Sequence, residues 1–155
     1  MKLSKRGEYA LRILLRLSAE AASGRPMLSI RDLADAEHIP QSFLEQILLQ
    51  LKKAGYLDSK RGISGGYHLA VPAEKIHAGE IIRLVDGTLA PVSCVSRIAY
   101  AKCTCPDEST CGLRILMAEV REAMIEVLDR RTLAEIAARS LAARGRRGQT
   151  GRRLR

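Results

Sequence analysis

Four cysteines near the middle of the chain are the residues with the clearest chemical potential. They follow the pattern Cys94-x8-Cys103-x-Cys105-x5-Cys111. Four thiols this close in sequence can form disulfides, bind zinc, hold an iron–sulfur cluster, or play no chemical part. These alternatives need different surroundings, so the neighbouring residues help to decide between them.

The surroundings of the cysteines favour soft-metal chemistry. The segment is polar and includes Lys102, Asp107 and Glu108, so it cannot belong to a hydrophobic core. It lacks the pair of C-x2–4-C knuckles typical of structural zinc, although four thiolates could still bind zinc. A reducing cytoplasm weighs against structural disulfides. Thiolates on a solvent-accessible loop are what an iron–sulfur cluster requires.

The composition indicates a helix-rich chain of one domain, or one domain with an extension, because it has 155 residues. Aromatic residues are scarce: the chain has one Phe, four Tyr and no Trp, so aliphatic side chains must build the core. No apolar run is long enough to span a bilayer, and the first residues do not resemble a signal sequence. We therefore expect a cytoplasmic protein.

The formal charge of +9 is unevenly distributed. Residues 1–71 carry a net charge of +4, residues 72–143 carry −1, and residues 144–155 contain six arginines and no acid. A basic N-terminal half suits a polyanionic partner such as nucleic acid. Charge alone does not identify a DNA-binding protein, so motifs must decide.

Apolar periodicity predicts three helices in the N-terminal region, at residues 4–22, 29–36 and 41–54. A capping box, Ser29-x-x-Asp32, opens the second helix, and Gly55 ends the third. Residues 56–70 then predict two short strands around a glycine-rich tip. Helix, short helix, turn, third helix and hairpin is the order of a winged helix-turn-helix.

In this arrangement the third helix would enter the major groove of DNA, and the hairpin tip would enter the minor groove. Gln, Ser and Glu can read base edges, and arginine suits a narrow minor groove. The candidate DNA-binding residues from this reasoning are Gln41, Ser42, Glu45, Gln46, Lys52, Lys60, Arg61, Gly65 and Gly66. Ser42-x-x-Glu45 is also a capping-box pattern, and Lys52 could simply be solvated.

The second half predicts a short helix at residues 78–84, the cysteine loop at 89–112, a long helix, and a last helix at 132–141. Apolar residues of the long helix recur at steps of four and three: Leu113, Met117, Val120, Met124 and Val127. This heptad seam suits a dimer contact, and it equally suits packing on the helix's own domain.

We therefore divide the chain into three parts. Residues 1–72 are expected to form the DNA-binding domain, and residues 73–143 the cysteine loop and dimerisation helices. Residues 144–155 are expected to form a basic, disordered tail, because they have too few apolar residues to fold.

Taken together, these motifs resemble a family of dimeric winged-helix bacterial regulators, from Met1 to about Arg139. The family includes the iron–sulfur cluster regulator IscR, the nitric oxide sensor NsrR, the iron regulator RirA and the cysteine metabolism repressor CymR. The segments that carry the resemblance are MKLS, EYAL, IPQSFLEQIL, LKKAGY, RGISGGY, LVDG and the cysteine segment. The resemblance implies a mainly α fold with a β-hairpin wing, a homodimer through the long helix, and a recognition helix whose Ser42, Phe43 and Glu45 face DNA. It also implies that Arg61 enters the minor groove.

The resemblance further implies a metal site. In the related regulators, three cysteines of this loop hold a 2Fe–2S or 4Fe–4S cluster, and Cys94, Cys105 and Cys111 match them. Cys103 departs from this pattern, and three roles are open to it: it replaces Cys105 as a ligand, exchanges with it during cluster conversion, or takes no part. The iron–sulfur cluster regulator has a histidine three residues after its last cysteine, where this chain has Arg114.

Glu8 is the candidate for a fourth ligand. It matches a carboxylate that, in the nitric oxide sensor, reaches over from the partner subunit. An acid in the first turn is also favoured by the helix dipole, so Glu8 has a purely structural alternative.

These inferences predict a DNA-binding transcriptional regulator that acts as a repressor. Its operator affinity would depend on a loop-bound iron–sulfur cluster that responds to redox state, nitric oxide or iron. The alternative is a metal-free thiol switch that uses Cys103, Cys105 and Cys111. An interaction protein that signals by binding an enzyme would leave these cysteines idle. No acid–base pair or nucleophile constellation indicates an enzyme or a small-molecule substrate, and nothing indicates a membrane partner.

Overall fold

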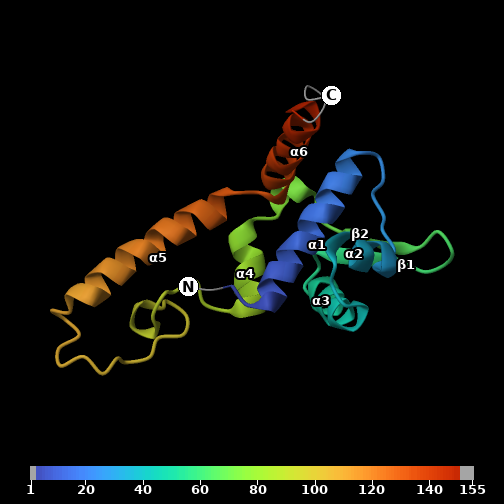
Figure 1. Ribbon diagram of the computed structural model, residues 1–155. Helices are drawn as coiled ribbons and strands as arrows, with labels where there is room; N and C mark the ends of the chain where they lie inside the picture. Colours follow the sequence, from blue (N-terminus) through green and yellow to red (C-terminus); the bar gives the residue numbers. More distant parts are fainter. Residues whose placement is uncertain (1–2, 151–155) are drawn as a thin grey trace.

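The computed structural model describes residues 3–150, and the side chains of residues 3–144. Within this part the chain forms six α-helices and one antiparallel hairpin (Figure 1). The helices are α1 Lys5–Ala22, α2 Ile30–Glu37, α3 Gln41–Lys53, α4 Ala78–Asp86, α5 Gly112–Arg130 and α6 Leu133–Thr150. The strands are β1 Leu57–Lys60 and β2 Gly66–Leu69, and two 3-10 turns are η1 Ala73–Lys75 and η2 Ser93–Val95. The predicted fold class, mainly α with a hairpin wing, is confirmed.

Helix α1 lies at the centre of the molecule and packs against α2, α3, α4 and α6 (Figure 1). Its inward stripe is fully buried at Ile13, Leu14 and Leu17. These side chains share one core with Leu44 and Leu48 of α3. The spacing of three and four residues places one continuous apolar face toward the core. This packing fixes the orientation of α3, the expected recognition helix.

Two of the predicted helix starts are capped by side chains. Ser4 Oγ accepts a hydrogen bond from Gly7 N at 3.0 Å. Ser29 and Asp32 bond reciprocally: Asp32 N donates to Ser29 Oγ at 3.1 Å, and Ser29 N donates to Asp32 Oδ2 at 3.4 Å. The capping box that the sequence predicted here is confirmed.

The alternative capping box at the start of α3 is wrong. Helix α3 follows Pro40, which caps it without a side-chain bond, so Ser42 already lies inside the first turn. Glu45 accepts a hydrogen bond from Gln41 Nε2 at 3.3 Å instead of closing a box with Ser42. Proline restricts its own φ angle to a value that is compatible with the residue before a helix. The helix therefore begins at Gln41, earlier than the Ser-x-x-Glu pattern suggests.

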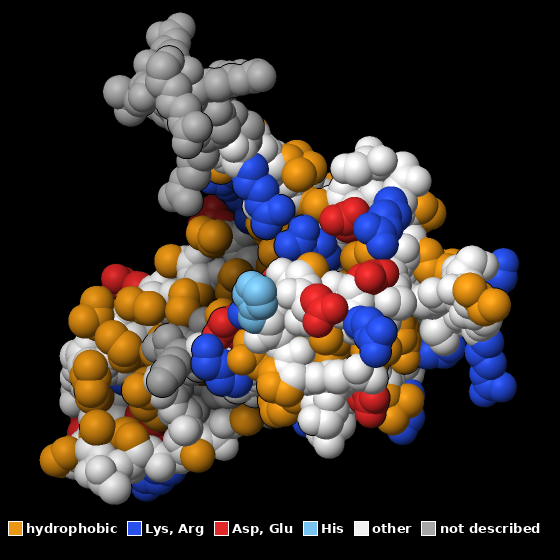
Figure 2. Space-filling view, turned by 45° about the vertical axis from the view of Figure 1, so that its right-hand side comes forward, with side chains coloured by type: hydrophobic (Ala, Val, Ile, Leu, Met, Phe, Trp, Pro, Cys, Tyr) orange, Lys and Arg blue, Asp and Glu red, His pale blue; other side chains and the backbone are white. Residues whose placement is uncertain are grey.

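Helix α5 forms an arm that projects from the rest of the chain, with the cysteine loop running beneath it (Figure 1). None of its residues is fully buried. Its inner side is joined to α4 by an ion pair of 2.7 Å between Arg83 and Asp129. Figure 2 shows hydrophobic side chains gathered on this part of the molecule. An arm with so much exposed apolar surface is typical of an interaction surface.

Helix α6 packs along α1 and continues to Thr150. The sequence predicted a disordered tail from Arg144, so the structure differs at residues 144–150, and residues 151–155 lie outside the described part. An existing helix can extend into these residues because nucleation has already occurred. Within the described residues no helix is long and apolar enough to cross a membrane.

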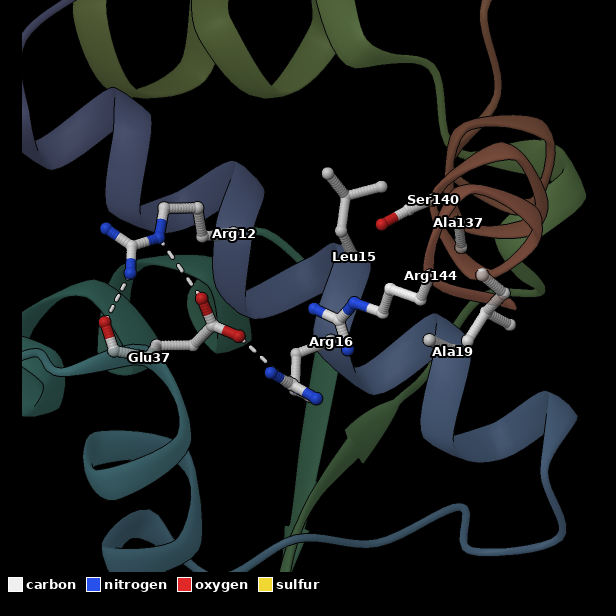
Figure 3. A pocket seen from close by; sticks show the side chains of 9 residues that line it. Arg12, Leu15, Arg16, Ala19, Glu37, Ala137, Ser140 and Arg144 are labelled. Carbon is white, nitrogen blue, oxygen red and sulfur yellow. Dashed lines mark hydrogen bonds and ion pairs between the residues drawn. The ribbon is translucent and has the colours of Figure 1, made fainter. Parts of the chain in front are cut away.

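Glu37, at the end of α2, is clamped by two arginines of α1 (Figure 3). Arg12 Nε lies 3.1 Å from Glu37 Oε2, and Arg16 Nε lies 2.8 Å from Glu37 Oε1. Arg12 also donates to the Glu37 carbonyl oxygen. The Glu37 side chain is only 13% exposed. The clamp holds the turn that leads into α3, where His38 adopts a left-handed conformation with φ of 52°.

We expect Glu37→Gln to lower the free energy of unfolding by about 1–3 kcal/mol, since it removes the charge that both guanidinium groups face. Chemical denaturation at one fixed protein concentration measures this change. The matched control is Glu20→Gln, because Glu20 pairs with Arg16 at a longer 3.6 Å and is 27% exposed. If both variants lose the same free energy of unfolding, the contact of Glu37 with two arginines stabilises the fold no more than the Glu20–Arg16 pair does.

Candidate functional site

The loop between α4 and α5 brings all four thiols into one continuous group. Cys111 Sγ lies 3.7 Å from Cys105 Sγ. The sulfurs of Cys94 and Cys103 lie within 4.8 Å of each other and of a carboxylate oxygen of Glu108. The sulfurs of Cys103 and Cys111 both lie close enough to Cys105 to raise its pKa, so Cys105 connects the two pairs. All four cysteines are half-buried and none forms a disulfide.

A tight turn between Cys105 and Cys111 explains why these two thiols meet. Asp107 accepts hydrogen bonds from Ser109 N at 2.9 Å, from Ser109 Oγ at 2.6 Å and from Thr110 Oγ1 at 2.6 Å. These bonds, led by that from Ser109, lower the pKa of Asp107 to about 2. An aspartate that binds the chain two residues ahead folds the backbone back on itself, which returns Cys111 toward Cys105.

The thiols differ in how readily they ionise. The backbone N–H of Cys105 and neighbouring thiol groups lower the pKa of Cys103. The adjacent sulfurs of Cys103 and Cys111 favour the protonated form of Cys105 and raise its pKa to about 12. Burial, above all, raises the pKa of Cys94. Of these three thiols, Cys103 therefore forms a thiolate most easily.

The cysteine group is fastened to the start of α5. Cys111 is the residue that directly precedes this helix and caps it, with its carbonyl accepting from Ile115 N at 3.1 Å. Arg114, one turn along, donates from Nε to the Cys94 carbonyl oxygen at 3.4 Å. Further along, Arg97 of the loop pairs with Glu122 of α5 at 2.9 Å. A change in the arrangement of the cysteines would therefore act directly on α5.

Glu108 is a candidate donor that the sequence reasoning missed. Its carboxylate lies beside Cys94 and Cys103, and Tyr100 donates its hydroxyl to Glu108 Oε2 at 2.7 Å. Glu108 Oε1 lies 3.3 Å from Arg114 Nε. The signal was present in the sequence, because Glu108 stands between two cysteines. Only the folded loop shows that it turns toward Cys94, fourteen residues earlier.

Glu8, the other carboxylate candidate, lies on α1 and faces basic neighbours. It pairs with Lys5 Nζ at 2.8 Å and with Arg12 at 3.3 Å. The hydrogen bond from Lys5, more than any other interaction, lowers the pKa of Glu8. Glu8 is not among the donors that converge on the cysteines of its own chain. Its role as a ligand in the partner subunit stays a prediction.

Helix α3 presents the polar face that the sequence predicted for DNA recognition. Its exposed residues in the first two turns are Gln41, Ser42, Phe43, Glu45 and Gln46. Phe43 is 39% exposed, and its ring meets that of Tyr9 edge-on, with centroids 5.6 Å apart. Tyr9 thereby braces one side of Phe43 and leaves the other side open. The contacts of these residues with DNA stay a prediction.

The hairpin wing carries its basic residues outward. Lys60 and Arg61 are exposed, and Arg61 forms no ion pair with any residue whose side chain the structure describes. Figure 2 shows Lys and Arg side chains on the protruding hairpin. Gly62, at the tip, has a φ of 116°, a conformation that side chains disfavour. This arrangement leaves the Arg61 guanidinium free for a polyanion.

Three other predicted DNA-binding residues have structural roles. A Cβ atom on Gly65 would collide with the Lys60 carbonyl, and one on Gly66 with the Leu28 carbonyl. Lys52 Nζ donates to Ser59 Oγ at 2.6 Å and pairs with Asp58 at 3.0 Å. Gly65, Gly66 and Lys52 therefore shape and hold the wing, and their contact with DNA stays a prediction.

The apolar seam predicted on α5 is partly exposed in the single chain, and its role as a dimer contact stays a prediction. Met117 and Met124 are half-buried on the side that faces the rest of the chain. The exposed large apolar residues of α5 are Leu113 at 59% exposure, Ile115 at 56%, Leu116 at 52%, Val120 at 37% and Val127 at 59%, and all but Ile115 follow one outer stripe along the helix. The sequence reasoning missed Leu116, because two interleaved stripes with heptad spacing run along this helix. The outer stripe is the surface available to a partner.

Known proteins are similar to this chain in both sequence and fold. The profile of the Rrf2 family, described as iron-dependent transcriptional regulators, matches residues 3–139. The chain belongs to the Rrf2 family of transcriptional regulators. It is 40% identical over 138 residues to an rrf2-like HTH-type transcriptional regulator of Rhodobacter capsulatus, covering 88% of this chain and 92% of that protein.

Other members of the Rrf2 family are similar along most of their length. The HTH-type transcriptional regulator NsrR of Bacillus licheniformis is 32% identical, covering 88% of this chain and 92% of that protein. The solved structure of CymR, the global cysteine regulator of B. subtilis, has a TM-score of 0.73 at 31% identity, covering 89% of this chain and 97% of CymR. That of T. potens IscR has a TM-score of 0.68 at 26% identity, covering 90% and 88%. The chain is thus a winged-helix transcriptional regulator and not an enzyme.

Proposed function

We propose that this Rrf2-family protein is a homodimeric DNA-binding regulator, acting as a repressor, whose operator affinity is controlled by an iron–sulfur cluster in the cysteine loop. The observation that carries the proposal is the convergence of four thiols at the start of α5. Cys94, Cys105 and Cys111 are the principal ligands, and Cys103 and Glu8 are further candidates. Redox state, nitric oxide or iron supply would be the signal.

The donors suit such a cluster. Four soft sulfur atoms lie within one loop, half-buried, where solvent and small oxidants can reach them. When bound, the cluster supplies a redox-reactive centre with several thiolate ligands. Zinc could also use four thiolates, but the family profile describes iron-dependent regulators.

The loop can transmit its state to the DNA-binding surface through α5. Cys111 starts α5, and Arg114 and Arg97 join the loop to this helix. If α5 forms the dimer contact, any shift of its first turn changes the spacing of the two α3 helices. Half-site spacing is set by the dimer, so operator affinity would follow.

Anaerobic purification of the full chain tests the proposal. We expect a brown protein with visible absorption, with iron and sulfide in comparable amounts, and with an operator affinity that changes when the cluster is removed. A colourless anaerobic preparation that contains stoichiometric zinc would contradict the proposed iron–sulfur cluster. Duplexes selected from a random pool would supply the operator.

One observation favours a second candidate, a metal-free thiol switch. Cys105 and Cys111 sulfurs already lie 3.7 Å apart, so a disulfide needs only a small movement. Peroxide would oxidise one thiol to a sulfenic acid, releasing water, and the second thiol would displace another water to close the disulfide. Counting free thiols after peroxide treatment, alongside metal analysis, separates this candidate from the cluster.

We expect Arg61→Ala to weaken operator binding by about tenfold, which corresponds to about 1.4 kcal/mol. The exposed guanidinium at the wing tip is free to enter the minor groove. Fluorescence anisotropy over a series of salt concentrations measures both the affinity and its salt dependence, which should become shallower.

The matched control for Arg61 is Arg130→Ala. Arg130 is also an exposed arginine, but it lies at the end of α5 and pairs with Glu126 at 2.9 Å. Its replacement should leave operator affinity unchanged. If both variants lose the same affinity, the effect of Arg61 reflects net charge and not a wing contact.

A further inference from the structure

Glu108 has surroundings unlike those of Asp107, the other acid in the cysteine loop. Its Oε1 atom is sealed from solvent and accepts no hydrogen bond from any described residue. The nearest cation is Arg114 Nε at 3.3 Å, and the side chain as a whole is 20% exposed. The neighbouring Asp107, in contrast, accepts three hydrogen bonds. Because this oxygen accepts no hydrogen bond, its lone pairs stay available to a metal cation.

Two sulfur donors lie beside the Glu108 carboxylate. The Cys94 and Cys103 sulfurs and one Glu108 carboxylate oxygen lie within 4.8 Å of one another. They come from separate stretches of chain, since Cys94 belongs to η2 and the other two stand on either side of Cys105. Sulfur and carboxylate oxygen together are ligands that zinc, cobalt and ferrous iron accept.

The opposite oxygen of Glu108 is held in place. Tyr100 donates its hydroxyl to Oε2 at 2.7 Å, which fixes the orientation of the carboxylate beside the two sulfurs. Metal-binding carboxylates are commonly oriented by such a second hydrogen bond. Tyr100 is therefore a positioning residue for Glu108.

We propose that Glu108 is a metal ligand supplied by the same chain, and that its carboxylate shares a transition-metal ion with the sulfurs of Cys94 and Cys103. Cys105 and Cys111 form the other side of the group, 3.7 Å apart. This inference rests on the proposed function in that the loop binds metal. It goes further by assigning an oxygen ligand from within the loop and by making Cys103 a ligand.

Cobalt(II) is the probe, because its visible bands report both thiolate ligands and coordination number. Co²⁺ is titrated anaerobically into the metal-free full-length protein. The wild type should bind with thiolate-to-cobalt absorption, and Glu108→Gln and Cys103→Ala should each bind at least about tenfold more weakly, with altered bands. Tyr100→Phe should lie between wild type and Glu108→Gln. The matched control, Glu119→Gln, removes an exposed charge from α5 and should bind like wild type.

The same variants are then loaded with iron and sulfide, and the loss of iron to a chelator is timed. Glu108→Gln should lose iron at least about tenfold faster than wild type. If Glu108→Gln binds both metals like wild type, or if only Glu8→Gln weakens metal binding, Glu108 is not a ligand, and the proposed iron–sulfur cluster is unaffected. If Co²⁺ binding depends on Glu108 but no iron–sulfur cluster assembles, Glu108 is a ligand and the proposed cluster is contradicted. A wild-type protein that binds neither metal overturns both.

Discussion

Replacing Cys111 with alanine is expected to leave the regulator without bound iron when it is purified anaerobically. Loss of an outer-shell partner typically weakens metal binding by about 10–100-fold, and loss of a direct ligand should exceed about 100-fold. Cys111 also starts α5, so its thiol is the donor that joins the loop to this helix. The visible absorption should disappear, and operator affinity should equal that of the metal-free wild type. Iron analysis, absorption and anisotropy measure these three quantities.

Thr104→Ala is the matched control for Cys111→Ala. Thr104 is exposed and stands between Cys103 and Cys105, so the change disturbs the same loop without removing a thiol. This variant should keep its iron and its regulated operator affinity. If Cys111→Ala retains the absorption of wild type, the cluster does not use the donor at the start of α5, and the proposed coupling has no basis.

Introducing a charge at Val120 is expected to dissociate the proposed dimer. Val120 lies in the middle of the outer stripe of α5, between Leu116 and Val127. An unpaired charge in a buried interface costs about 3–5 kcal/mol, and 1.4 kcal/mol is a factor of ten. The dissociation constant of the dimer should therefore rise by at least about 100-fold in Val120→Glu. Analytical ultracentrifugation over a range of concentrations measures this change.

The monomer should also bind DNA poorly, because it can engage only one half-site. The control is Glu126→Gln, which alters an exposed charge on the same helix outside the apolar stripe. This variant should remain dimeric. A dimer that persists in Val120→Glu would place the subunit contact elsewhere and would remove α5 from the route between the loop and DNA.

Much of the DNA-binding fold is predictable from sequence because its signals are local. The stripe of Ile13, Leu14 and Leu17 repeats with the helix, and the Ser29–Asp32 capping box is written in four consecutive residues. Gly55 ends α3 with a φ of 82°, as its position after the last apolar residue predicts. Each of these features depends on residues within one or two turns.

Sequence patterns were least decisive where two of them overlap. At the start of α3 the Ser42–Glu45 pattern competed with Pro40, and the proline determined the first turn. On α5 two interleaved stripes satisfy the same heptad spacing, and packing against α4 and η2 decides which one faces outward. Periodicity gives the spacing of a face but not the side on which the rest of the protein lies.

The sequence by itself determined the class of protein: an ordered set of motifs for a winged helix-turn-helix, followed by four cysteines in a polar loop and a long amphipathic helix. Only the tertiary structure decided which donors meet. Cys94 and Glu108 are fourteen residues apart, and Tyr100 and Arg114 hold Glu108 from two sides. Irregular loops have no period from which such proximity can be calculated, because their path depends on individual hydrogen bonds like those of Asp107. The fold is therefore predictable from repeating sequence patterns, whereas the metal site depends on single contacts that form only when the chain folds.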